Sequence, residues 1–206
     1  MFRLDWIKSF YHYFHFRLAC RVVMTISFRS LNKHDINYSK VIDLFFEAFP
    51  KIQLLPQWVV KYRMRNGKDG FEVLYEHNYW VGFIYAKEYK NIVFVKFFAI
   101  SESLRSSGYG SKVMDSMGKK YSDKRIVLNI EELDEKEENY QQRVKRKAFY
   151  ESNKFNSTGF IIKEFAERQE MLIHGGAISK KEIEAMYRHF LGNLLFSLLK
   201  PEVLQI

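Results

Sequence analysis

Residues 92–121 constrain the fold most, because a strand, a turn with two glycines and a helix follow one another there without interruption. The run IVFVKFFAI at 92–100 is almost continuously apolar, which is typical of a strand in a protein core. The turn SESLRSSGYGSK follows, and 113–121 then carries apolar residues at helical spacing. This succession predicts a sheet with helices packed against it.

The same two patterns extend over most of the chain and predict one mixed α/β fold. Seven strands are expected, at 25–31, 71–75, 79–86, 92–100, 125–130, 160–165 and 170–174. Helices are expected at 38–49, 56–66, 113–121, 140–152 and 179–200. The last helix begins with a capping box, formed by Ser179 and Glu182. The order of these elements predicts a mixed sheet flanked by helices.

Composition excludes several classes of protein. The 206 residues are 47% hydrophobic, with only 10 Gly and 3 Pro, which excludes collagen-like and wholly disordered chains. The single cysteine, Cys20, excludes an intramolecular disulfide and favours a cytoplasmic location. The six histidines show no metal-ligand spacing, so we expect no metal site. No run approaches the ~18–20 apolar residues that span a bilayer, so we expect no stable membrane insertion.

The net charge of +9 is compatible with three kinds of partner, namely nucleic acid, an acidic membrane surface or an anionic cofactor. The charges are scattered, however, and the densest basic cluster, 143–147, follows the acidic segment 131–138. We interpret this pattern as a solvated surface of mixed sign. No RNA-binding signature occurs, so we expect no nucleic-acid partner.

Residues 1–23 differ from the rest of the chain. They carry aromatic and basic residues throughout and lack the cleavage site of a signal peptide. The pattern changes at Met24, so we interpret 1–23 as upstream read-through or a loosely attached extension; an amphipathic helix that docks on a membrane or a partner is the alternative. We expect the main domain at 24–178 and a C-terminal helix and tail at 179–206.

The turn at 101–112 is the candidate for chemistry. Gly108 and Gly110 let the backbone approach a ligand closely, and the free N–H groups at the start of the helix attract phosphate oxygens. Arg105 adds a cation, while three serines, at 106, 107 and 111, add hydroxyl donors. The Walker loop and the dinucleotide fingerprint both fail here, because Val113 stands where each needs another residue.

The remaining pattern, R-x-x-G-x-G at Arg105, Gly108 and Gly110, resembles the acyl-coenzyme A pyrophosphate loop of the GNAT N-acetyltransferase superfamily. A second block, AFYESN at 148–153, resembles the aromatic-Tyr-Glu run that ends a later helix of that family. The resemblance covers 24–174. Within the superfamily, the chain is similar to an uncharacterised bacterial branch. It implies a twisted, mostly antiparallel sheet flanked by helices, with acetyl-coenzyme A as co-substrate. The residues that it assigns to this cofactor are Ile100, Arg105, Ser106, Ser107, Gly108, Tyr109, Gly110 and Ser111.

The resemblance also implies direct attack of an amine on the thioester, with Tyr150 as the acid that protonates the leaving thiolate. For the base we choose Glu131, which shares one strand face with Asn129; a solvated acidic loop, with water as the base, is the alternative. Phe94 and Lys96 stand where relatives often carry a carboxylate.

Two further positions depart from the family pattern. Arg143 replaces an Asn that contacts the cofactor's pantetheine arm in many members. Lys154 replaces a turn glycine, for which we expect Gly159 to substitute.

These observations leave three functions open. The preferred one is an N-acetyltransferase that acts on a primary amine of a small molecule or a protein, as a monomer or homodimer. A non-catalytic acyl-coenzyme A-binding or regulatory protein would keep the loop without a working acid and base. The third function, a basic module that binds nucleic acid or a membrane, is supported only by the net charge and by residues 1–23.

Overall fold

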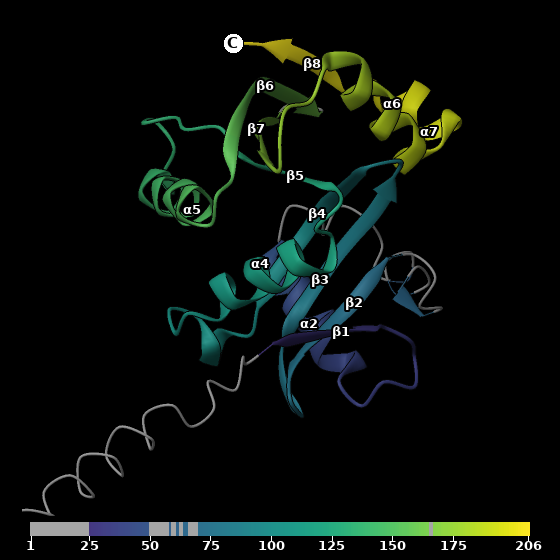
Figure 1. The fold of residues 1–206 in the computed structure, drawn as a ribbon, viewed down its shortest axis with the longest axis vertical. Helices are drawn as coiled ribbons and strands as arrows, with labels where there is room; N and C mark the ends of the chain where they lie inside the picture. Colours follow the sequence, from purple (N-terminus) through teal and green to yellow (C-terminus); the bar gives the residue numbers. More distant parts are fainter. Residues whose placement is uncertain (1–24, 50–57, 59–60, 62–63, 66–69, 165–166) are drawn as a thin grey trace, which may run out of the picture.

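An eight-stranded sheet runs through the part of the chain that the computed structural model describes, namely residues 25–49, 58, 61, 64–65, 70–164 and 167–206. The strand order is β1-β2-β3-β4-β5-β7-β6-β8 (Figure 1). The strands are β1 (Ile26–Ser30), β2 (Phe71–Glu76), β3 (Tyr79–Tyr89), β4 (Ile92–Ile100), β5 (Arg125–Glu131), β6 (Asn156–Glu164), β7 (Glu167–His174) and β8 (Glu202–Gln205). All neighbouring pairs are antiparallel except β4 and β5, so the expected mixed and mostly antiparallel sheet is confirmed.

Helices cover both faces of this sheet. They are α2 (Tyr38–Ala48), α4 (Tyr109–Lys120), α5 (Tyr140–Ser152), α6 (Lys180–Leu191) and α7 (Asn193–Leu199), and a short 3-10 helix, η2 (Glu102–Leu104), precedes α4. Alternate residues of a strand point to opposite faces. Val95 and Leu128 pack with α4 and α5, whereas Phe94 and Val127 pack with α6. In Figure 1, α4 lies in front of the sheet and α2 behind it.

Strands β4 and β5 pair over only four residues and then separate. The pairs run from Ile92 with Arg125 to Val95 with Leu128, and none is recorded beyond them. The next residue of β4, Lys96, is the extra residue of a β-bulge, because Tyr85 and Ala86 of β3 lie opposite Phe97 and Val95. The end of β4 therefore pairs with β3 alone and leaves its other edge open toward β5.

The C-terminal segment differs from the sequence prediction in two ways. The helix that begins at Ser179 ends at Gly192, whose φ of 77° and ψ of 158° are not helical, and α7 follows as a separate helix. After Pro201 the chain adds β8 to the edge of the sheet beside β6, where we expected only a tail. The structure thus contains one strand more than the seven predicted.

Two predicted features lie wholly or mainly outside the described residues. These are the extension at 1–23 and the helix expected at 56–66. Among the described helices, none is both long and apolar enough to cross a membrane.

Candidate functional site

The turn between β4 and α4 places free backbone donors beside the open edge of β4. Gly108 is the N-cap of α4 and adopts a φ of 82°, in the left-handed region that favours glycine. No side chain on the described part of the chain caps this helix, and the first N–H groups of any helix lack acceptors within it. A Cβ at Gly108 would meet no atom of the described residues within 4 Å, so as far as these residues go the space above the turn is open. Such a helix start binds anions such as a pyrophosphate.

Arg105 lies at the same turn but is already engaged. Its Nε donates to the backbone oxygen of Ile100 at 3.2 Å, and its Nη2 forms an ion pair with Glu47 of α2 at 2.6 Å. Both side chains of this ion pair are about half exposed to solvent, so the pair is weak and exchangeable. Arg105 therefore links the end of β4 to the loop, and its charge stays available to an incoming anion.

Ile100 presents its backbone to the open edge. The next residue, Ser101, donates its N–H to Val81 of β3 at 2.9 Å. Consecutive strand residues direct their N–H and C=O groups to opposite sides, so those of Ile100 point away from β3. This is the side from which β5 has separated.

The other predicted residues of the loop contribute in different ways. Ser107 donates its hydroxyl weakly to the backbone oxygen of Arg105, at 3.4 Å, and Ser106 adopts a left-handed φ of 60°. The hydroxyl of Tyr109 donates to Glu76 Oε2 at 2.8 Å, so its side chain is held at the end of β2. Gly110 and Ser111 lie in the first turn of α4.

Glu76 anchors this part of α4. It is buried and accepts a hydrogen bond from Lys112 Nζ at 2.7 Å as well as the bond from Tyr109. The hydrogen bond from Lys112 is the main cause that holds the pKa of Glu76 below its usual value. The paired carboxylate fixes the start of α4 against β2.

Tyr150 lies near the end of α5 in the core between α4, α5 and β5. Its ring packs against Phe149 at 5.0 Å and Phe155 at 5.6 Å. Burial raises the pKa of its hydroxyl to about 12, and Arg146 offsets this only in part. No hydrogen bond of this hydroxyl is recorded among the described residues. It therefore keeps its proton at neutral pH, as an acid must.

Glu131 ends β5 and forms an ion pair with Arg146 of α5. Its neighbour Ile130 points into the core that holds Tyr150, so the Cβ of Glu131 points to the opposite face. The structure thus places the two residues on opposite faces of β5, and Arg146 contacts the carboxylate from one turn before Tyr150. The role of Glu131 as base stays a prediction.

Arg143 ties the acidic segment to α5 and is itself buried. Its three donor nitrogens bond to Asn139 Oδ1, to the backbone oxygen of Glu132 and to Glu137 Oε2, at 2.7, 2.8 and 2.7 Å. Glu132 also pairs with Arg168. Several carboxylates of this segment are therefore neutralised by local arginines.

The turn after α5 forms without the expected glycine. Lys154 itself adopts a left-handed φ of 67°, and the N–H of Phe155 returns to the backbone oxygen of Tyr150 at 3.0 Å. The expectation that Gly159 takes over this turn is wrong, because Gly159 lies within β6 at an irregular register.

Sequence reasoning missed Glu164, which brings a carboxylate to β4 from a distant part of the chain. Both of its oxygens contact Lys96 Nζ, at 2.8 and 2.7 Å. The only sequence signal was Lys96 itself, the one charge in an apolar strand.

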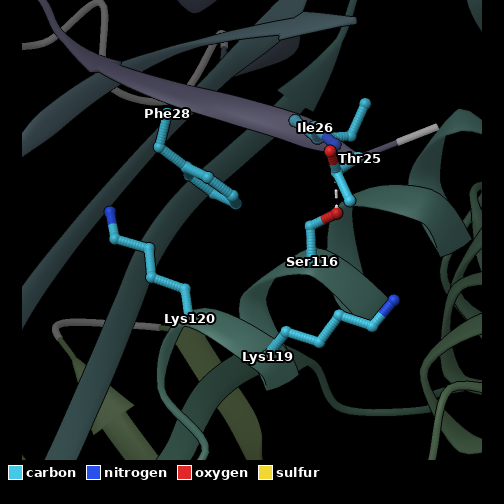
Figure 2. Close-up of a pocket in the computed structure, with 6 residues that line it drawn as sticks. All are labelled: Thr25, Ile26, Phe28, Ser116, Lys119 and Lys120. Carbon is cyan, nitrogen blue, oxygen red and sulfur yellow. Dashed lines mark hydrogen bonds between the residues drawn. The ribbon is translucent and has the colours of Figure 1, made fainter. Parts of the chain in front are cut away.

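A separate pocket of about 230 Å³ lies between β1 and the C-terminal half of α4 (Figure 2). Ser116 accepts a hydrogen bond from the N–H of Ile26 in its wall, at 3.1 Å. Lys119 and Lys120 point apart, and they pair with Asp115 and Glu72 respectively. Because it lies at the other end of α4 from Gly108, this pocket plays no part in the site described above.

No protein-family model matches the chain, and no curated protein matches its sequence. Solved structures do match it. A protein from Bacteroides thetaiotaomicron assigned to the GNAT family of acetyltransferases aligns with a TM-score of 0.63 and 20% identity, over 82% of this chain and 98% of that one.

Two matching structures contain coenzyme A. An aminoglycoside 6'-N-acetyltransferase aligns with a TM-score of 0.51 and 15% identity, over 73% of this chain and 96% of that one. PaiA N-acetyltransferase from Thermoplasma acidophilum aligns with a TM-score of 0.51 and 11% identity, over 74% of this chain and 100% of that one. The fold of this chain is therefore that of the GNAT N-acetyltransferases, as the sequence resemblance predicted.

Proposed function

We propose that this protein is an acyltransferase that moves the acetyl group of acetyl-coenzyme A to a primary amine. The observation that carries the proposal is the open left-handed turn at Gly108, at an uncapped helix start beside the open edge of β4. One end of that edge offers donors for a pyrophosphate, and the other offers the separated strands between which a thioester can lie. Two structural neighbours contain coenzyme A, which supports the same cofactor here.

The transfer sets three tasks, and we assign each of them to a residue on the described part of the chain. We assign stabilisation of the oxyanion to the outward N–H of Ile100, and protonation of the thiolate to the hydroxyl of Tyr150. A thiol has a pKa near ~8.5, so its thiolate accepts a proton from a tyrosine only when the hydroxyl is close and well aligned. The third task, deprotonation of the ammonium, we assign to Glu131, with water as the alternative.

A non-catalytic acyl-coenzyme A-binding protein is the second candidate, and one observation favours it. Glu131 is paired with Arg146, and Phe94 and Lys96 occupy the β4 positions where members of the family that the chain resembles often carry a carboxylate. Such a protein would bind the cofactor without turnover.

Two measurements test the proposal together. Purified protein is incubated with acetyl-coenzyme A and a panel containing spermidine, an aminoglycoside and a peptide with a free N-terminus, while free thiol is followed. We expect thiol release that depends on one of the amines. Binding of coenzyme A with no release for any amine would select the non-catalytic candidate.

The cofactor site is tested by calorimetry on two matched glycine variants. Gly108 and Gly159 have φ values of 82° and 76°, and a Cβ at either meets no atom within 4 Å. Valine therefore introduces similar backbone strain at both positions. We expect Gly108→Val to lose coenzyme A binding and Gly159→Val to retain it; equal affinities in the two variants would overturn the site.

We also propose a cytoplasmic location and a monomer or homodimer. Both proposals are based on the sequence alone. Cell fractionation would test the location, and light scattering of the full chain would test the oligomeric state.

A further inference from the structure

Polar side chains gather on the α6 side of the sheet, where β4 and β5 separate. The last β4–β5 pair joins Val95 to Leu128, so Lys96 and Asn129 are the first residues beyond it on their strands. Asn129 shares its face with Val127, which packs against α6. The two residues thus mark the two sides of the opening.

The ammonium group of Lys96 occupies a site built by other residues. Both oxygens of Glu164 contact its Nζ at 2.8 and 2.7 Å, and the rings of Phe94 and Tyr187 lie 5.9 Å from it. A carboxylate with aromatic faces is the environment that binds an alkylammonium ion. The side chains of Lys96 and Glu164 are 17% and 24% exposed, so solvent reaches the pair.

A second hydrogen-bond acceptor, on Asn129, lies beside the same Tyr187 ring. Asn129 Nδ2 donates to the hydroxyl of Tyr187 at 2.6 Å and to Gln169 Oε1 at 3.1 Å. Its Oδ1 is buried and has no hydrogen-bond partner among the described residues. A buried acceptor of this kind costs free energy unless a donor arrives.

Of the described residues around Glu164, Lys96 is the cation that pairs with its carboxylate. Burial and, next, the Glu164 charge raise the pKa of the Tyr187 hydroxyl well above its usual value, so Tyr187 stays neutral. Lys163, the residue before Glu164, alternates to the other side of the strand and pairs with Glu202 at 3.6 Å. Lys96 is thus the ammonium that competes for Glu164.

We propose that Glu164, Asn129 and the rings of Phe94 and Tyr187 form the binding site for the acceptor, an unbranched primary alkylammonium group, and that Lys96 occupies this site until the acceptor displaces it. The inference rests on the proposed acetyl transfer, because it identifies the opening between β4 and β5 as the place where the amine meets the thioester. It adds the substrate class and a specificity-determining pair.

Direct binding tests this without turnover. The probe is n-butylammonium, which matches the lysine side chain, titrated into wild type, Lys96→Met, Lys96→Arg and the double variant Lys96→Met/Glu164→Gln. Lys163→Met is the matched control, since it removes an ammonium one residue from Glu164. Thermal melting confirms that each variant is folded.

We expect Lys96→Met to bind n-butylammonium at least tenfold more tightly than wild type, and the double variant to lose this gain. Lys96→Arg keeps a cation at the site, so it and Lys163→Met should match wild type. Butyltrimethylammonium, which has no N–H donor, should bind Lys96→Met more weakly than n-butylammonium. Equal affinity in Lys96→Met and wild type, or in Lys96→Met and the double variant, overturns the proposal.

Turnover separates this inference from the proposed function. If acetyl transfer occurs, adding Glu164→Gln to Lys96→Met, in which no lysine competes for the carboxylate, should raise KM for the amine at least tenfold and leave KM for acetyl-coenzyme A unchanged. If wild type releases no thiol while Lys96→Met still gains affinity for n-butylammonium, the acetyltransferase proposal fails and the ammonium site stands. An unchanged amine KM when Glu164→Gln is added to an active Lys96→Met enzyme would remove the site.

Discussion

Gly110 lies against the ring of Phe149, and this contact joins α4 to α5 at the candidate cofactor site. A Cβ added to Gly110 would come within 2.9 Å of Phe149 Cζ and 3.0 Å of its Cε2. Phe149 in turn packs edge-on against Tyr150, with ring centroids 5.0 Å apart. The second glycine of the motif thus serves helix packing as well as the turn, and it couples the loop to the proposed acid.

We expect Gly110→Ala to destabilise the protein by about 1 kcal/mol. Alanine gains about 0.8–1 kcal/mol of helix propensity over glycine, whereas overpacking costs about 1–3 kcal/mol. Thermal melting of Gly110→Ala, Phe149→Leu and the double variant measures the coupling. In the Phe149→Leu background the alanine should become stabilising; destabilisation of the same size in both backgrounds would show that Phe149 is not the cause.

Glu182 makes the stability of the C-terminal helix depend on pH. Its carboxylate pairs with Arg125 at 2.7 Å and completes the capping box with Ser179, and the bond from Arg125 is the main cause that lowers its pKa to about 2. A depressed carboxyl pKa stabilises the fold above the usual value of 4.5, and this contribution is lost as pH falls toward 2.

Denaturant unfolding of wild type and Glu182→Gln at several pH values tests this. Because the Glu182 side chain is 40% exposed, we expect wild type to be more stable by about 1–2 kcal/mol at pH 7. The difference should shrink as pH falls below 4.5 and vanish only below about pH 2. Glu184→Gln, on the same helix, is the control. A difference that does not change with pH would contradict the role of the charge.

Glu131 and Glu132 provide a matched test of the base. Glu131 ends β5 and Glu132 follows it, and each pairs with one arginine, Arg146 or Arg168 respectively. If Glu131 accepts the proton of the amine, Glu131→Gln should lower kcat by roughly 10²-fold, and Glu132→Gln should stay within twofold. Equal kcat values in both variants would assign the deprotonation to water.

Local patterns in the sequence were sufficient to predict most of the helices and strands of the fold. The apolar run of β4, the helical spacing on α4 and the capping box at Ser179 each reflect a preference that acts within a few residues. β8 carries only four residues and forms because β6 offers an edge, which no local pattern reveals. The break at Gly192 was missed because the residues on both sides favour a helix.

In the candidate site, too, some residues could be predicted from a local pattern and others could not. The turn at Gly108 is a local motif, so its residues could be named from the sequence. The pair of Lys96 and Glu164 joins strands that are 68 positions apart, and the pair of Glu131 and Arg146 depends on how α5 crosses β5. Ion pairs between residues this far apart in the sequence can be predicted only once the topology of the fold is known.

Removing the hydroxyl of Tyr150 separates an enzyme from a binding protein. Tyr150→Phe keeps the ring and its packing against Phe155, so the fold and coenzyme A affinity should change little. If the hydroxyl protonates the thiolate, kcat should fall by roughly 10²-fold, near the low end for an acid step because the thiolate is already fairly stable. Its pKa of about 12 further predicts no loss of activity from Tyr150 ionisation below about pH 11.

Tyr121→Phe is the matched control for that experiment. Tyr121 is as buried as Tyr150, each being 9% exposed, and it belongs to the same core at the far end of α4. Its hydroxyl lies beside Lys120 and Glu72, which the hydroxyl of Tyr150 does not. Its loss likewise removes one phenol hydroxyl from a buried ring without reaching the opening between β4 and β5. A fall in kcat confined to Tyr150→Phe would therefore report the proton transfer itself. If both variants turn over within twofold of wild type, Tyr150 is not the acid, because the ring alone then supports the full rate.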